Sequence, residues 1–347
     1  MSLAWPEVEQ RLGPLAEALR GADRIAVLGH VNADLDSIGS VLALHLALEA
    51  MGKTSWPVTP DPGAPYWAFL PGYDRLVVGA PEWLQPDAVA VLDTEISPER
   101  LGQAWPLVER AGLRLNLDHH DTNRGGADAA LVEPAAAATG ELVFYLVSAL
   151  GVPLTPQIAA CLYAAILTDT GSFRYANTTA RTLALASALV AAGVEPHEMA
   201  TRIYDTRSWA YMKLLGRLLS RLERTEDGKV AWMWVRHEDT LDAGLLPSEV
   251  EGLVQYPRMI EGVEVALLFK EVEPGVIRVS LRSQRFVDVA AIARAFGGGG
   301  HLRAAGCTLT GSLEKAMERV VEACRQAVRR EVVAGDRAGA SQGAGEG

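Results

Sequence analysis

The chain has 347 residues, more than one hydrophobic core usually supports, and an ordinary globular composition, so two domains are expected. Its 32 Lys and Arg stand against 43 Asp and Glu, and the formal net charge of −11 argues against binding to long duplex nucleic acid. The three widely spaced cysteines form no CxxC motif, so the sequence predicts neither a disulfide framework nor a thiolate zinc site.

The first apolar segments predict a helix followed by a buried strand that ends on a polar loop. Helical spacing of apolar residues covers 4–20, and the run RIAVLG at 24–29 then opens onto His30. The next residues, VNADLDSIGS, carry Asp34 and Asp36 and lead into an apolar helical stretch. This is a β-turn-α unit in which either aspartate, or Ser37, could also cap the helix.

Two further apolar runs end on ionisable residues in the same way. The run 88–92 opens onto Asp93, and the run 113–117 opens onto LDHHD. Such runs are typical of buried parallel strands, whose carboxyl ends form the ligand-binding edge of open α/β sheets. Residues 57–86 give no clear period beyond a short strand at 76–78. Helical stretches are predicted at 139–150, 156–167 and 179–192, the second running directly into Asp169.

The second half has a different pattern, in which strands precede helices. Residues 195–222 read as a charged helical connector, followed by strands at 230–235, 263–269 and 276–281 and a helix at 287–296. A last helix is predicted at 312–333. The expected fold is therefore an α/β N-terminal domain, with a mainly parallel sheet flanked by helices, plus a smaller α+β domain. The predicted boundaries are 1–193, 194–222 for the connector, 223–333, and 334–347 for a disordered tail.

Histidines and carboxylates gather at the predicted strand ends and predict a metal site. Each alone could end a strand or cap a helix, but several converging carboxylates would repel one another unless cations held them. Oxygen and imidazole ligands without thiolates favour Mn²⁺ or Mg²⁺ over structural zinc. Two metal ions roughly 3.5–4 Å apart are usual for phosphoester chemistry. The candidates are His30, Asp34, Asp36, Asp93, Asp118, His119, His120 and Asp169.

These motifs resemble the DHH phosphoesterase family: H-x-x-x-D-x-D from His30, an isolated Asp93, D-H-H from Asp118 and D-T-G from Asp169. The resemblance implies a centre of two Mn²⁺ ions, with Mg²⁺ or Co²⁺ remaining open. It implies that His30 and Asp34 hold one ion, that Asp36, His119 and Asp169 hold the other, and that Asp93 bridges them. It further implies that His120 contacts phosphate or donates a proton and that Asp118 orients a ligand histidine. Where the family often has P-D-G-D, this chain has Ala33-Asp34-Leu35-Asp36.

A tract of four glycines precedes His301 and predicts a tight turn or a close approach to a ligand. Its backbone N–H groups could form an anion-binding nest, whereas the alternative is a flexible hinge or a helix C-cap. The run through Gly306 also resembles the G-G-G-H-x-x-A-A-G signature of the DHH-associated C-terminal domain, which implies a grip on the phosphate or base of a substrate. The substrate-binding candidates are Arg282, Ser283, Gly298, Gly299, Gly300, His301 and Arg303.

The resemblance implies a hydrolase of the nanoRNase/pAp phosphatase branch, which cleaves short oligoribonucleotides and adenosine 3′,5′-bisphosphate (pAp). The alternatives are a phosphodiesterase for cyclic di-AMP or pApA, a RecJ-like single-strand exonuclease, and a non-catalytic nucleotide-binding regulator. A manganese inorganic pyrophosphatase has a similar metal set but a different second domain. We expect small nucleotides as partners and no membrane, since no run of 18 apolar residues occurs. Homodimer formation stays open, and a cytoplasmic location is expected.

Overall fold

The computed structural model describes residues 3–245, 247–250 and 252–342, and the side chains of all of these except 247–248, 301 and 332–342. The chain separates into two compact units, Met1–Thr206 and Arg207–Gly347. The stretch 194–222 is divided between them: α9 (Pro196–Ala200) and the π-helical turn η4 (Thr201–Asp205) lie in the first unit, and α10 (Trp209–Leu219) lies in the second. Its assignment as a connector stays a prediction.

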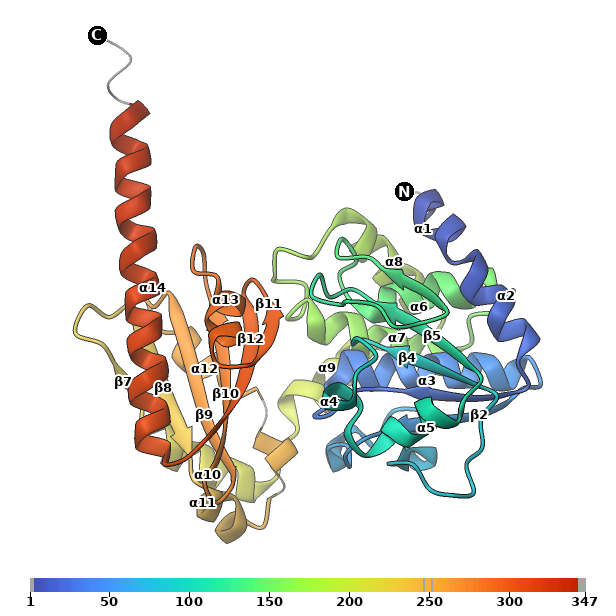
Figure 1. Ribbon diagram of the computed structural model, residues 1–347, viewed down its shortest axis with the longest axis horizontal. Helices are drawn as coiled ribbons and strands as arrows, with labels where there is room; N and C mark the ends of the chain where they lie inside the picture. Colours follow the sequence, from blue (N-terminus) through green and yellow to red (C-terminus); the bar gives the residue numbers. More distant parts are fainter. Residues whose placement is uncertain (1–2, 246, 251, 343–347) are drawn as a thin grey trace. The chain divides into compact units, whose positions relative to one another are not determined.

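The N-terminal unit is built on a six-stranded sheet in the order β3-β2-β1-β4-β5-β6, in which every neighbouring pair is parallel (Figure 1). The chain runs outward from β1 to β3, returns to the middle, and runs outward again from β4 to β6. The strand order therefore reverses between β1 and β4, which is where open α/β sheets place their ligands. The strands are β1 (Arg24–Leu28), β2 (Thr54–Thr59), β3 (Val77–Val78), β4 (Ala88–Leu92), β5 (Leu113–Asp118) and β6 (Ala129–Val132).

Helices cover both faces of this sheet because its strands are apolar on both sides. In β4, Ala88, Ala90 and Leu92 pack into the larger core, while Val89 and Val91 pack into the smaller one. On the larger-core side lie α1 (Pro6–Arg11), α2 (Gly13–Gly21), α3 (Leu35–Ala50), α6 (Thr139–Ala149), α7 (Pro156–Asp169) and α8 (Ala180–Ala191). On the other side lie α4 (Pro98–Leu101), η3 (Gly102–Ala104) and α5 (Trp105–Arg110).

Local details of this unit differ from the sequence prediction. The helix predicted over 4–20 is two helices, and the second begins at Gly13 with Pro14 in its first turn, a position where a missing N–H costs little. The poorly patterned region 57–86 holds the end of β2, the turns η1 (Pro65–Trp67) and η2 (Tyr73–Arg75), and β3.

The C-terminal unit has a mixed six-stranded sheet in the order β11-β12-β10-β9-β8-β7. The pair β8 and β9 is parallel and the other pairs are antiparallel. The strands are β7 (Glu223–Arg224), β8 (Val230–Val235), β9 (Val265–Glu273), β10 (Val276–Ser283), β11 (Gly299–His301) and β12 (Ala304–Thr310). The helices are α10, α11 (His237–Ala243), η5 (Pro247–Val250), α12 (Gln255–Arg258), α13 (Val289–Ala295) and α14 (Leu313–Gln342).

This sheet also has a core on each face, so the predicted fold class is confirmed in both units. Val230 packs with α13 and α14, while Ala231 and Met233 pack with α10. Helix α14 continues to Gln342, past residue 333 where the sequence predicted it to end, through residues that include good helix formers such as Ala and Arg. Residues 343–347 of the predicted tail lie outside the described residues. Among the described residues, no helix is long and apolar enough to cross a membrane.

Candidate metal centre

The candidate site lies at the carboxyl ends of β1, β4 and β5. His30 comes two residues after β1, Asp93 directly follows β4, and His119 directly follows β5. Asp169 is the last residue of α7. The reversal of strand order between β1 and β4 thus brings together side chains that are far apart in the sequence.

Asp34 is both a helix cap and a potential ligand. Its Oδ1 accepts hydrogen bonds from the backbone N–H groups of Asp36 (3.0 Å) and Ser37 (3.1 Å) at the start of α3. The capping alternative is therefore realised at Asp34 and not at Ser37. The Asp34 carboxylate is exposed, and only its Oδ1 caps the helix. Its Oδ2 can therefore bind a cation.

Asp36 is buried, and the N-terminus of α6 holds it in place. Its two carboxylate oxygens accept the backbone N–H groups of Thr139 (2.7 Å) and Gly140 (2.9 Å). An added Cβ at Gly140 would lie 2.6 Å from the Ala165 side chain, so the close approach requires glycine. Burial raises the pKa of Asp36 to about 7. The carboxylate is therefore half protonated near neutral pH unless a cation stabilises its charge.

Asp93 lies at the centre of the site. Its Oδ2 is 3.4 Å from Nε2 of His30, and its Oδ1 is 3.6 Å from Nε2 of His119. The hydroxyl of Thr139 donates to Oδ1 at 2.9 Å. Asp93 has a left-handed backbone (φ 63°), a conformation that costs a non-glycine residue about 1–3 kcal/mol and often marks a functional site. Burial and the neighbouring carboxylates raise its pKa well above the usual range.

The rings of His30 and His119 are oriented by backbone carbonyls. Nδ1 of His30 donates to the carbonyl of Val31 (2.8 Å), and Nδ1 of His119 donates to the carbonyl of Ala136 (3.2 Å). The proton is thereby fixed on Nδ1, and each Nε2 lone pair faces the carboxylates. Burial lowers the pKa of both imidazoles, that of His30 to about 4, so both are neutral bases at physiological pH.

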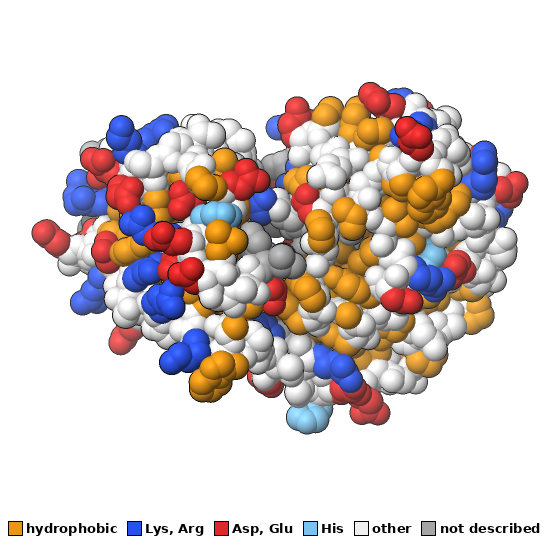
Figure 2. Space-filling view, turned by 90° about the horizontal axis from the view of Figure 1, so that it is seen from below, with side chains coloured by type: hydrophobic (Ala, Val, Ile, Leu, Met, Phe, Trp, Pro, Cys, Tyr) orange, Lys and Arg blue, Asp and Glu red, His pale blue; other side chains and the backbone are white. Residues whose placement is uncertain are grey.

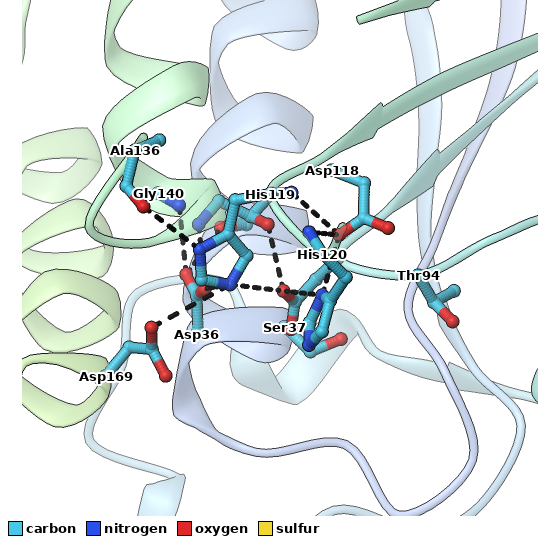
Figure 3. A network of polar contacts seen from close by, with 12 residues as sticks. Asp36, Ser37, Thr94, Asp118, His119, His120, Ala136, Gly140 and Asp169 are labelled. Carbon is cyan, nitrogen blue, oxygen red and sulfur yellow. Dashed lines mark hydrogen bonds and ion pairs between the residues drawn. The ribbon is translucent and has the colours of Figure 1, made fainter. Parts of the chain in front are cut away.

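The side chains form three overlapping groups with ligand atoms that all lie within 4.8 Å of one another. His30 and Asp34 share one group with Asp93, while Asp36 and Asp169 share another with His119. Figure 3 shows His119 between Asp36 and Asp169, with Nε2 at 3.6 Å and 3.7 Å from their carboxylates. The third group joins Asp93, His119 and His120 and so overlaps the first two. This donor set is rich in oxygen and includes two carboxylates with raised pKa values, so it fits divalent cations.

The Asp118 carboxylate bonds to the ring of His120. The resemblance implied that Asp118 orients a ligand histidine, and that role stays a prediction. Oδ1 of Asp118 accepts from Nδ1 of His120 (2.8 Å) and from the backbone N–H groups of both histidines, and its Oδ2 accepts from Asn123 (2.7 Å). Burial would raise the pKa of Asp118, but these bonds outweigh it and lower the pKa to about 2. Burial likewise opposes protonation of His120, yet the bond and charge of Asp118 raise its pKa.

Two groups that support the ligands were missed by sequence reasoning. The buried carboxylate of Glu141 pairs with Arg181 and accepts the N–H of Ala137 (2.7 Å), while Arg181 also donates to the carbonyl of Ala135 (2.8 Å). They fix the loop whose Ala136 carbonyl orients His119. Independently, Asn177 donates to the backbone carbonyls of both Ala137 (2.9 Å) and Asp169 (3.2 Å).

The glycine tract of the C-terminal unit combines a helix end with an edge strand. The N–H groups of Gly297 and Gly298 bond to the carbonyls of Arg294 and Ala293, so the C-cap alternative holds for its start. Gly300 pairs with β12, and a Cβ there would lie 2.5 Å from the Ala304 carbonyl. The anion nest stays a prediction. The side chain of His301 lies outside the described residues.

Two of the remaining substrate candidates of this unit, Ser283 and Arg303, bond to the same loop. Ser283 is buried, and its hydroxyl donates to the carbonyl of Val287 at 2.7 Å. Arg303 donates to the same carbonyl from Nη1 at 2.8 Å, and Arg282 donates to the carbonyl of Leu281 at 3.0 Å. The carboxylate of Glu264 accepts three backbone N–H groups of the loop, from residues 285–287. The Ser283 hydroxyl therefore stabilises the loop, and Nη1 of Arg303 is held by the carbonyl of Val287.

Metal affinity is expected to depend on pH because ions and protons compete for the same carboxylates. A cation binds the ionised form of Asp36, and the pKa of this carboxylate is about 7. Below pH 7, Asp36 must therefore release a proton when it binds an ion. Affinity for Mn²⁺ should fall at least about tenfold for each pH unit below 7 and level off above it. Calorimetry in buffers with different ionisation enthalpies should count the released protons. Affinity that does not change between pH 5 and 7 would contradict the assignment of Asp36.

Comparisons with known proteins agree with this architecture. The family model of the DHH family, N-terminal domain, matches residues 24–166, and that of the DHHA1 domain matches residues 227–330. The chain is 36% identical over 327 residues to the bifunctional oligoribonuclease and PAP phosphatase NrnA of Thermus thermophilus, covering 94% of this chain and 97% of that protein. It is 30% identical to the protein of the same name from Bacillus subtilis, covering 83% and 90%.

Among solved structures, an exopolyphosphatase-related protein from Bacteroides fragilis matches 93% of this chain and 96% of its own, with a TM-score of 0.80 and 24% identity. RecJ from Thermus thermophilus, solved in complex with Mn²⁺, matches 93% of this chain and 56% of its own, with a TM-score of 0.53 and 16% identity. At these identities both likenesses establish the fold.

Proposed function

Because the chain belongs to the DHH family, whose members are metal-dependent hydrolases of phosphoester bonds, we propose that it cleaves short oligoribonucleotides and dephosphorylates pAp. The observation that carries the proposal is the overlap of three ligand groups at the reversal point of the parallel sheet. The names of the relatives from Thermus thermophilus and Bacillus subtilis, which match over most of the chain, support this substrate class.

The centre would hold two Mn²⁺ ions, with His30 and Asp34 at one and Asp36, His119 and Asp169 at the other. Asp93 would serve both, since its two oxygens face a histidine of each set. When bound, such ions supply Lewis acidity toward water and phosphoryl oxygens. The chain itself supplies neutral, oriented imidazoles and the buried carboxylates of Asp36 and Asp93.

His120 would handle the leaving oxygen of the substrate. Its Nδ1 is held by Asp118 at 2.8 Å, so Nε2 points away from that bond and can donate a proton or bind a phosphoryl oxygen. The raised pKa keeps a proton on this ring to higher pH than on a free histidine. Asp118 would act as the positioning residue.

In the C-terminal unit we assign the phosphate grip to Arg282, Arg303, Gly298, Gly299, Gly300 and His301, with Ser283 supporting the loop beneath them. This unit carries 20 Lys and Arg against 19 Asp and Glu, whereas the N-terminal unit carries 12 against 24, so the net negative charge belongs to the N-terminal unit. Figure 2 shows the Lys and Arg side chains of one face gathered mainly over the C-terminal unit. A unit with nearly equal numbers of basic and acidic side chains, and with few arginines at the proposed grip, suits a short anionic substrate better than a long polyanion.

Replacing Arg303 with lysine should lower kcat/KM for nucleotides by about tenfold while leaving the metal content unchanged. Lysine keeps the charge but loses the planar guanidinium that reaches the Val287 carbonyl and a phosphate at once. Arg294→Lys, at an exposed arginine on α13, is the matched control. Loss of metal in Arg303→Lys, measured by elemental analysis, would contradict the assignment.

Substrate length separates this function from the exonuclease alternative. Initial rates on labelled RNAs from the dimer to roughly 24 nucleotides should be highest at about two to five nucleotides, with a log–log salt slope near −2, as about three phosphate contacts predict. Equal or higher rates on the longest strand would favour a RecJ-like activity. Cyclic di-AMP and pApA belong in the same panel, and nucleotide binding without turnover would favour the regulator.

A further inference from the structure

Arg100 is a cation built into the rim of the candidate metal centre. It lies in α4, one short turn beyond Asp93, and its carbonyl accepts the N–H of Val31 (2.8 Å), the residue after His30. Its Nε donates to the hydroxyl of Thr94 at 2.7 Å. Thr94 is buried, and the Asn116 side chain donates to its carbonyl at 2.8 Å. Both the backbone and the near end of the guanidinium are therefore fixed.

The far end of this guanidinium has no protein partner among the described residues. Within the part of the chain that the structure describes, only Nε forms a side-chain hydrogen bond, and the guanidinium forms no ion pair with the nearby carboxylates. Arg181 and Arg110 in the same unit, by contrast, bond to protein oxygens through their terminal nitrogens. An arginine that served only to brace the loop would need no more than its Nε and backbone contacts. The terminal nitrogens of Arg100 remain as four N–H donors.

The position of Arg100 places those donors beside the reacting end of the site. Its carbonyl is bonded to the residue that follows His30, and its Nε is bonded to Thr94, the residue that follows Asp93. Figure 3 shows its partner Thr94 on the His120 side of the network, away from Asp169. A phosphoryl group next to Asp93 and His120 would bring its oxygens to this positive charge.

We propose that Arg100 binds the non-bridging oxygens of the scissile phosphate through its terminal nitrogens. The inference rests on the proposed function and adds a catalytic residue to it. In the reaction, a water oxygen bonds to phosphorus and releases one proton, the bond from phosphorus to the leaving oxygen breaks, and that oxygen takes up one proton. Negative charge grows on the non-bridging oxygens during this change, so preorganised guanidinium bonds strengthen at the transition state.

Four Mn²⁺-loaded proteins test the inference: wild type, Arg100→Ala, Arg100→Lys and the control Arg114→Ala. Arg114 is an exposed arginine near the amino end of β5, at the opposite edge of the sheet. We expect Arg100→Ala to lose about 10²–10³-fold in kcat on an RNA dimer with its Mn²⁺ content unchanged. Arg100→Lys should recover part of the loss, and added guanidinium ion should raise the rate of Arg100→Ala but not that of wild type.

An unchanged kcat in Arg100→Ala overturns the inference, and so does a loss that follows Mn²⁺ content or resists rescue by guanidinium. If Arg100→Ala does not fold, Arg100→Lys decides alone: it supports the inference if kcat falls at full metal loading and overturns it if kcat is unchanged. Binding of orthophosphate to the Mn²⁺-loaded proteins, measured by calorimetry, does not depend on the nucleotide substrate. Weaker phosphate binding in the variant, combined with an inactive wild type, would sink the proposed function and leave the Arg100 contact standing.

Discussion

Replacing Asp93 with alanine is expected to lower kcat/KM by at least about 10³-fold and to remove more bound metal than the loss of any other ligand. The reason is its shared position. One oxygen lies 3.4 Å from Nε2 of His30 and the other 3.6 Å from Nε2 of His119, so a single truncation takes a ligand from two of the three groups. It also leaves the hydroxyl of Thr139 without its carboxylate partner.

Asp34→Ala is the informative comparison, because Asp34 belongs to a single ligand group. The substitution should weaken the binding of one metal ion more than that of the other. It should also destabilise α3 by about 1 kcal/mol, because the helix loses its N-cap. Asp121→Ala, at an exposed carboxylate just beyond the histidine pair, is the control for a change of charge alone. Equal losses of metal and activity in Asp34→Ala and Asp93→Ala would argue against a shared ligand.

Replacing His120 with alanine should lower kcat by about 10²–10⁴-fold while the protein keeps most of its metal. His120 is held through Nδ1 by Asp118, and two of the three candidate ligand groups contain His30 or His119 without His120. If the ring protonates the leaving oxygen, a p-nitrophenyl ester should be nearly as reactive in the variant as in wild type, because that leaving group departs without a proton. If the ring holds phosphate instead, both kinds of ester should slow equally.

The control for this prediction is Asp118→Asn. Asparagine keeps the shape and one oxygen but loses the charge that raises the pKa of His120. We expect an intermediate loss and a pH–rate profile whose alkaline limb moves to lower pH, since the ring then releases its proton more easily. An unchanged profile would mean that His120 does not act as an acid.

The sequence predicted that the candidate side chains would converge, and the structure brings them together, because three of them follow a recognisable local pattern. An apolar run that stops at His30, Asp93 or His119 marks the end of a buried strand, and the parallel topology then brings these ends to one edge. The edge strand β6 and the hairpin of β11 and β12 were missed because they are short or rich in glycine and alanine. Their pairing comes from the neighbouring strands and not from a local period.

The supporting residues could not be predicted because they act through tertiary contacts. Thr139 holds Asp36 with its backbone N–H across 103 residues of sequence, and any residue at that position except proline could supply this donor. Glu141 and Arg181 act on the Ala136 carbonyl through the loop between them. The motif alone also does not say which of the two histidine rings Asp118 holds, and the geometry shows a bond to the ring of His120.

The most direct test of the account is to strip the protein of metal with a chelator and to titrate Mn²⁺ back while hydrolysis of pAp and of an RNA dimer is followed. The overlapping groups around Asp93 and His119 predict two ions per chain, no turnover in the stripped protein, and full rates on both substrates only when the second ion is bound. Full hydrolysis with a single ion per chain, or undiminished hydrolysis in the stripped protein, would contradict it.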